Sequence, residues 1–289
     1  MSEQVRSVQR TRFIAPRVER SLITAGHALL VVATLVAALF PLFWVFLGSF
    51  KLPADVMRLP PVIIFEPTIA NYLTVIRDRF VFCFENSVVI SGGSVLLTII
   101  VGVPAAYGLS RLRIRFKKTL MLLILSVRFA PYIIFALPLF LIMSELGLIG
   151  HRPSLVVVYT IINLPVVIWL MRAFFDDIPT ELDEAAAIDG ASRFRTFMSI
   201  LIPCARPGIA TVTILSFIFA WNEYLFALIL SGRDSQTLTV GLTRFLGGME
   251  DAIRWGQLSA WSVAIVAPIV ILALLVNRHL RRGFTGGLG

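Results

Sequence analysis

The residues best suited to directed polar contacts lie together in residues 181–203, ELDEAAAIDGASRFRTFMSILIP. Carboxylates, arginines and aromatic rings alternate there, a composition suited to docking and charge pairing rather than to bond making. Asp183 follows Thr180 at the spacing of a helix-capping box. Gly190 stands where a left-handed residue would end that helix. The pattern predicts a first short helix that begins after Thr180 and ends at about Asp189.

A second short helix is predicted just after this glycine. Its spacing places Phe194, Phe197 and Leu201 on one face. Arg193 points elsewhere, and Pro203 ends the unit. An amphipathic unit of this kind either rests on lipid headgroups or docks on a partner protein. Periodicity alone leaves both interpretations open.

Motifs for bond-making chemistry are absent from the sequence. A Walker A loop needs glycines whose amides cradle phosphates and a lysine that contacts them, but none of Lys51, Lys117 and Lys118 follows a glycine. No G-x-S-x-G segment occurs, the histidines are far apart, and Cys83 and Cys204 have no metal-ligand spacing. We therefore expect a chain that is not an enzyme and that binds no metal or cofactor itself.

Two charges fall inside long apolar stretches. Arg128 lies ten residues beyond Lys118, about 15 Å along an α-helix, and charges at that depth usually face a bundle interior or a water-filled path. Pathway lining or gating is the functional interpretation, and a structural pair or a guanidinium that reaches the interface is the alternative. Asn222 and Glu223 lie toward the far end of a later stretch, where they either bond a neighbouring helix or contact a solute.

The elements that must position these residues are apolar helices. Hydrophobic residues make up 57% of the 289 residues and charged ones only 15%, too few to cover a soluble domain of this length. Six apolar windows are each close to the ~20 residues that cross a bilayer as a helix. They cover residues 28–50, 86–110, 119–143, 153–171, 207–231 and 257–276. The sequence predicts an all-α, polytopic membrane protein with six transmembrane helices.

The net charge of +9 reports topology rather than a nucleic-acid partner. With the N-terminus in the cytoplasm, the segments on that side hold 17 of the 26 lysines and arginines, as the positive-inside rule requires. No basic run is interleaved with base-stacking aromatic residues, so we expect no nucleic-acid partner. The expected organisation is a cytoplasmic segment 1–27, a membrane domain 28–276 and a cytoplasmic tail 277–289.

The spacing within residues 181–203 resembles the EAA loop (about 172–206 here) of permease subunits of binding-protein-dependent ABC importers. Glu184-Ala185-Ala186 is followed after three residues by Gly190, and after nine more by Ile200-x-Ile202-Pro203. The family usually has Leu where Ile202 stands. EPTIANY (66–72), WNEYLFAL (221–228), TLTVGL (237–242) and GFTGGLG (283–289) resemble the maltose-permease branch, which imports carbohydrates. We call residues 181–203 the EAA segment.

The resemblance implies a type I ABC importer transmembrane domain in the cell inner membrane. In the family, the EAA helices fit a cleft on the ATPase subunit and transmit its closure to the membrane helices. The implied ATPase-coupling residues are Glu184, Ala185, Ala186, Asp189, Gly190, Arg193, Phe194, Phe197, Ile200 and Pro203. The loop at about 232–256, with Gly247, Gly248 and Met249 at its tip, is implied to contact a solute-binding protein.

The implied partners are a second, homologous permease subunit, a dimer of ABC ATPases that carries ATP and Mg, an extracytoplasmic solute-binding protein and membrane lipid. The implied solute is a sugar or a related derivative, moved by alternating access. A secondary transporter or channel that works without an ATPase is the alternative interpretation, and an intramembrane enzyme comes third.

Overall fold

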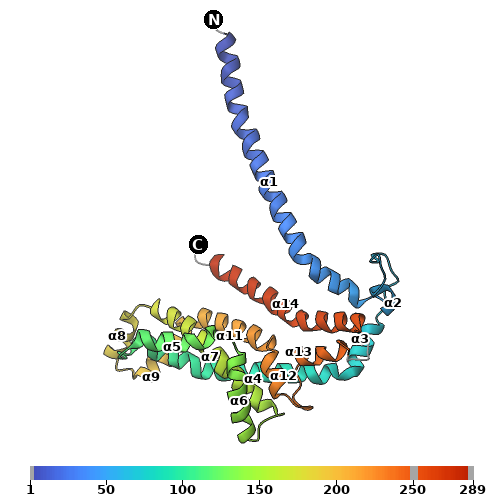
Figure 1. Ribbon diagram of the computed structural model, residues 1–289. Coiled ribbons are helices and arrows are strands. Elements are labelled where there is room, and N and C mark those ends of the chain that lie inside the picture. Colours follow the sequence, from blue (N-terminus) through green and yellow to red (C-terminus); the bar gives the residue numbers. More distant parts are fainter. Residues whose placement is uncertain (1–2, 248–252, 286–289) are drawn as a thin grey trace.

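The computed structural model describes residues 3–247 and 253–285, and within these ranges all regular structure is helical (Figure 1). Four helices contain stretches long and apolar enough to cross a membrane: α1 (Glu3–Ser49), α4 (Val81–Arg111), α7 (Arg152–Asp176) and α14 (Trp255–Thr285). They correspond to the first, second, fourth and sixth apolar windows of the sequence. The prediction of an all-α, multi-pass membrane protein is confirmed.

The third apolar window, residues 119–143, does not form one continuous helix. It forms α5 (Lys117–Phe129) and α6 (Ile133–Glu145), which are bent by 94° relative to each other. Pro131 explains the break, because proline has no amide hydrogen to donate and disfavours a helical conformation in the preceding residue. Ala130 is accordingly extended, with ψ of 139°.

The fifth window, residues 207–231, is interrupted as well. α11 (Arg206–Trp221) ends inside it, and the short α12 (Leu225–Leu230) follows after residues 222–224. A separate bend of 76° joins the end of the EAA segment to α11. Within the described residues the chain has four continuous candidate spans, or up to six when each bent pair counts as one span.

The centre of the bundle is the contact between α4 and α7, the most extensive between any two helices. Small residues permit it, since a β-carbon on Gly102 of α4 would lie 2.9 Å from a methyl group of Val167 on α7. α11 packs against both helices and contributes Val212 to their shared apolar cluster. Helices associate in this way in a bilayer, where tight packing replaces the hydrophobic driving force.

α1 lies outside this centre and projects away from the other helices (Figure 1). Its apolar span is exposed along nearly its whole length, and its last turn packs on α14, where a β-carbon on Gly48 would lie 3.0 Å from the Ser259 hydroxyl. Short elements gather around the same end of α14 and α4. They include α2 (Pro53–Val56), α3 (Ala70–Val75), η1 (Ile76–Phe80), α13 (Leu238–Gly241) and η3 (Leu242–Phe245).

Candidate functional site

The EAA segment forms two helical pieces joined at a glycine, as the sequence predicts. α8 (Glu181–Ile188) is followed by a turn and then by α9 (Arg193–Thr196), η2 (Phe197–Leu201) and α10 (Ile202–Cys204). Gly190 in the turn has a φ of +78°, and no atom lies within 4 Å of the place its β-carbon would take. The turn therefore requires glycine for its left-handed backbone and not for close packing.

The capping box predicted at the start of α8 does not form. Thr180 makes no side-chain hydrogen bond to the helix N-terminus, and Asp183 pairs instead with Arg111 of α4. The start of α9 is capped, because Ser192 Oγ accepts a hydrogen bond from the backbone amide of Arg195 at 3.3 Å. The prediction at Thr180 is wrong because an ion pair from a distant helix competes for the carboxylate.

Phe194 and Phe197, expected on one outward face, lie in opposite environments. Phe194 is 72% exposed, whereas Phe197 is only 7% exposed. The Phe197 ring packs on Tyr107 of α4, with 4.8 Å between ring centroids, and lies 6.3 Å from Phe175 of α7. Phe197 thus anchors the EAA segment to the bundle rather than facing a partner. Its spacing could not show this, because both neighbours come from helices far away in the sequence.

The outward surface of the EAA segment holds a second large apolar side chain, Ile188, which is 88% exposed. Ile188 ends α8, and Phe194 lies in α9 just beyond the turn. Glu184 and Asp189 are exposed on the same segment. A signal for Ile188 was present in the sequence, since a lone isoleucine between an alanine run and an aspartate is poorly placed for a core. Exposed apolar side chains among charges are suited to a protein interface.

The other residues predicted for ATPase coupling are distributed between surface and interior. Ala185 and Arg193 are exposed, and Ala186 is buried. Ile200 and Pro203 are half-buried beside the bundle. The segment therefore has an outer side that a partner can reach and an inner side that holds it in place.

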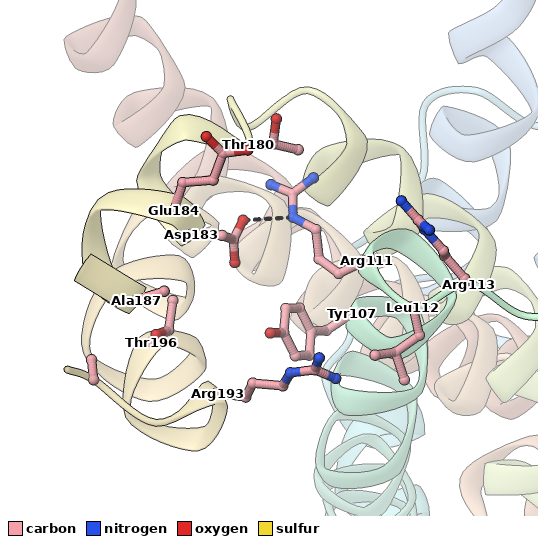
Figure 2. A pocket seen from close by; sticks show the side chains of 11 residues that line it. Tyr107, Arg111, Leu112, Arg113, Thr180, Asp183, Glu184, Ala187, Arg193 and Thr196 are labelled. Carbon is pink, nitrogen blue, oxygen red and sulfur yellow. Dashed lines mark ion pairs between the residues drawn. The ribbon is translucent and has the colours of Figure 1, made fainter. Parts of the chain in front are cut away.

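Arg111, the last residue of α4, ties the EAA segment to the bundle (Figure 2). Its Nε lies 2.8 Å from Asp183 Oδ2, and its Nη2 donates a hydrogen bond to the Ile178 carbonyl at 2.7 Å. The neighbouring Ser110 hydroxyl donates to Asp176 Oδ1, at the end of α7, over 2.5 Å. No local pattern points to Arg111, because Ile178 is 67 residues away in the chain.

Beside this ion pair lies a cleft of about 610 Å³ between the end of α4 and helices α8 and α9 (Figure 2). Its charged residues have both signs: Arg111, Arg113 and Arg193 line it together with Asp183 and Glu184. In Figure 2 Arg113 lies on the far side of Arg111 from Asp183. The cleft therefore lies next to the contact that holds the EAA segment.

Arg128 lies where α5 approaches its break, and it has no ion-pair partner among the residues that the structure describes. Its guanidinium lies over the ring of Phe219 in α11, 4.3 Å from the centroid, and 5.5 Å from the ring centroid of Tyr132. Tyr132 in turn packs on Phe226 of α12, with 6.0 Å between centroids. The two interrupted windows therefore meet at their breaks, with a cation held by aromatic rings alone.

Glu223 is buried and caps the short helix α12. Its two carboxylate oxygens accept hydrogen bonds from the backbone amides of Phe226 and Ala227, each at 3.0 Å. Asn222 is exposed, and its amide donates to the Ile218 carbonyl at 2.8 Å. These contacts favour the structural alternative for Glu223 over a solute contact. The partner is the next helix of the chain, whose free amides attract a carboxylate.

At the opposite end of α4, the segment that follows α12 is fixed to the bundle. Asn86 of α4 is fully buried, and its amide donates to the carbonyls of Asp234 and Gln236 at 3.3 and 3.0 Å. Arg152 Nε donates to Asn86 Oδ1 at 2.7 Å. Asn86 thus joins three segments of the chain that are distant in sequence.

The loop at 232–256 has a tightly held base. A β-carbon on Gly232 would lie 2.8 Å from the Cα atom of Gly150, so the two backbones touch. At the predicted tip, Gly247 has a left-handed φ of +77°. Gly248 and Met249 lie outside the described residues.

An exposed two-helix segment held at one end of an all-helical membrane bundle is the arrangement that the sequence led us to expect of a permease subunit. Residues 98–286 match the family of binding-protein-dependent transport system inner membrane components. The chain belongs to this family and is a multi-pass inner-membrane permease component of an ABC importer. The resemblance to permease subunits of binding-protein-dependent ABC importers is thereby confirmed.

Relatives and a solved structure match nearly the whole chain. It is 35% identical to the sulfoquinovosyl glycerol transport system permease protein SmoH of Agrobacterium fabrum over 257 residues. The aligned region covers 88% of this chain and 89% of that relative. The chain is 32% identical over 256 residues to the trehalose/maltose transport system permease protein MalG of Thermococcus litoralis, covering 87% and 91%. The crystal structure of a bacterial ABC transporter involved in the import of the acidic polysaccharide alginate superposes with a TM-score of 0.75 at 26% identity, covering 89% and 96%.

Proposed function

We propose that the chain forms part of the membrane pathway of an ATP-driven importer for a sugar or sugar-like solute, with an ABC ATPase docked on its EAA segment. The observation that carries the proposal is the two-sided EAA segment. Ile188 and Phe194 are exposed on its outer side, while Phe197 and Arg111 fix its inner side to the bundle. A segment with an exposed outer side and a buried inner side transmits a displacement imposed by a partner, because it cannot move independently of the helices on which it packs.

The ATPase supplies the energy in this proposal. The sequence has no Walker A motif, so ATP and Mg belong to the ATPase dimer. Ile188 and Phe194 enter its cleft, each contributing about 1.5–3 kcal/mol when fully buried. Glu184, exposed on α8, meets a cationic group there. A second, homologous permease subunit completes the pathway.

Transport proceeds by alternating access. Closure of the ATPases on ATP brings the EAA segments of the two permease subunits together, and the pathway opens toward the solute-binding protein. That protein docks on the 232–256 loop and contacts Gly247, Gly248 and Met249. ATP hydrolysis separates the EAA segments again and releases the solute inward. In this orientation both termini are cytoplasmic, which fits the distribution of 17 of the 26 positive residues.

The solute class rests on relatives that are named for sugar transport, of sulfoquinovosyl glycerol in one case and of trehalose or maltose in another. Within the pathway, Arg128 and Asn222 are the residues proposed to meet the solute. The Arg128 guanidinium lies over two rings and forms no ion pair in the described ranges. Its N–H groups are therefore suited to the oxygen atoms of a sugar.

Co-purification from the native membrane tests the proposal. The tagged chain, extracted in mild detergent, is expected to bring down an ABC ATPase and a second permease. The hydrolysis rate of that complex is expected to rise when the solute-binding protein and its sugar, chosen from a ligand panel, are added. Proteoliposomes that contain the chain alone serve as the control. Sugar uptake by those proteoliposomes without any ATPase would overturn the proposal in favour of a secondary transporter or channel.

A further inference from the structure

One helix, α4, contacts both ends of the molecule at which partners are proposed to dock. Its residues Asn86 and Arg111 are 25 positions apart, about 37 Å along an α-helix. Asn86 bonds the segment at the base of the 232–256 loop, and Arg111 bonds the EAA segment. A single helix therefore joins the two surfaces.

The contact at the EAA end consists of a polar and an aromatic part. The side chains of Arg111 and Asp183 are only 12% and 24% exposed. Their facing atoms, Nε and Oδ2, are shielded from solvent and have no hydrogen-bond partner in the described chain apart from this ion pair. One turn earlier on α4, Tyr107 packs on Phe197 of η2. Movement of the EAA segment relative to α4 would break both contacts and leave a shielded charge without its ion-pair partner.

The contact at the other end is equally direct. Ser87 Oγ accepts a hydrogen bond from the backbone amide of Leu238 at 2.8 Å, beside the Asn86 bonds. Cys83 lies against the α13 backbone, since a β-carbon on Gly241 would be 3.3 Å from its sulfur. The first two turns of α4 thus hold the segment that leads out of the loop base.

α4 (Val81–Arg111) is one helix of 31 residues that carries both contacts and continues through Pro104 in its interior. It is packed against α7 at van der Waals distance, as the Gly102–Val167 approach shows. Packed helices shift as units rather than deform continuously. A displacement imposed on the last turn of α4 is therefore expected to reach its first turn.

We propose that α4 carries the coupling between the ATPase and the solute-binding protein, with Arg111 as the positioning residue that joins it to the EAA segment. The inference rests on the proposed function, because it needs partners at both ends. Movement of α8 passes through Asp183 to Arg111, along α4, and through Asn86 to the loop base. A docked binding protein sends its signal to the ATPase along the same route in reverse.

The first test compares Arg111, at the end of α4, with Arg113 just beyond it, in the complete importer complex. Arg111→Ala removes the contact with Asp183, and Arg113→Ala removes an equal charge two residues away. Arg113 has no ion pair or hydrogen bond in the described ranges. The measured quantity is the hydrolysis rate with binding protein and sugar divided by the rate without them. For Arg111→Ala this ratio is expected to fall by about fivefold or more, the lower end of typical couplings between sites, whereas Arg113→Ala keeps it.

The second test asks whether both ends act through one route. Asn86→Ala, Arg111→Ala and the double variant are measured in the same assay. Independent sites this far apart have additive effects, so a double variant no worse than the poorer single variant supports a shared route along α4.

The possible outcomes separate this inference from the function on which it rests. Equal ratios for Arg111→Ala and Arg113→Ala, or additive losses in the double variant, would overturn the inference. Loss of the ATPase from both the Arg111→Ala and Arg111→Lys complexes would also overturn it, since Arg111 would then serve docking alone. A wild-type complex that lacks an ATPase, or that the binding protein does not stimulate, would contradict the proposed function instead.

Discussion

At the scale of single residues, Arg128 combines a place inside an apolar window with the lack of an acidic partner among the described residues. The rings of Phe219 and Tyr132 hold its guanidinium without neutralising it. Arg128→Ala is expected to lower sugar uptake into proteoliposomes about tenfold or more, because a hydrogen bond to a charged group contributes about 1.5–3 kcal/mol. Arg128→Lys keeps the charge but not the planar set of donors, and it should recover only part of the uptake. A failure of either complex to assemble would assign Arg128 a structural role.

Phe194 and Phe197 provide a matched pair three positions apart. Phe197→Ala is expected to lower the free energy of unfolding by about 3–5 kcal/mol, because it opens a cavity between α4 and α7. Phe194→Ser is expected to leave the melting temperature unchanged and to weaken retention of the ATPase. Thermal melting in detergent and ATPase pull-down at equal membrane levels measure the two effects. If Phe194→Ser retains the ATPase fully, the exposed ring is not part of the docking surface.

At the scale of elements, the break between α11 and α12 depends on the Glu223 carboxylate, which binds two free amides of α12. Glu223→Ala is expected to cost about 0.5–2 kcal/mol, as for other helix caps, and to lower the melting temperature. Asn222→Ala, at the exposed neighbouring position, is the control and should melt like wild type. Lower uptake by Glu223→Gln at an unchanged melting temperature would instead indicate a solute contact.

The joint between α8 and α9 depends on the left-handed backbone of Gly190. Gly190→Ala is expected to cost about 1–2 kcal/mol, because a β-carbon is disfavoured in that conformation. It should also change the position of Ile188 relative to Phe194 and so reduce retention of the ATPase. Gly92→Ala, in the middle of α4 with no atom within 4 Å of the new β-carbon, is the control and should retain the ATPase. Normal retention by Gly190→Ala would show that the joint tolerates another backbone conformation.

At the same scale, the apolar pattern of the sequence predicts where helices form but not how they are oriented. All six windows form helices, the third and fifth with a break, because a long apolar segment can satisfy its backbone in lipid only as a helix. The apolar windows give the length of each helix but not its direction, so they do not give the size of the 94° bend between α5 and α6. Pro131 indicates where the helix breaks but not the angle between α5 and α6, which depends on what α6 packs against.

At the scale of the whole molecule, the importer must link a solute-binding protein to an ATPase across the membrane. Deletion of residues 247–249 is expected to spare assembly and to reduce uptake, because solute would leave the docked binding protein less readily. The firm base of the loop, where Gly232 touches Gly150, should keep the deletion local. Uptake and subunit pull-down are measured together. Unchanged uptake in an assembled complex would show that the loop tip has no role in solute release.

The sequence by itself determined the helical membrane class, the apolar windows, the EAA spacing and the left-handed turn at Gly190. Each of these depends on composition or on residues within one short stretch, and local physics is sufficient to produce them. Only the tertiary structure decided that Phe197 is buried and Phe194 exposed, and that Asp183 pairs with Arg111 instead of capping α8. In each case a contact with a neighbour in sequence competes with a contact to a residue from a distant helix. Which partner wins depends on how α4 and α7 lie beside the EAA segment, and no spacing along the chain encodes that directly.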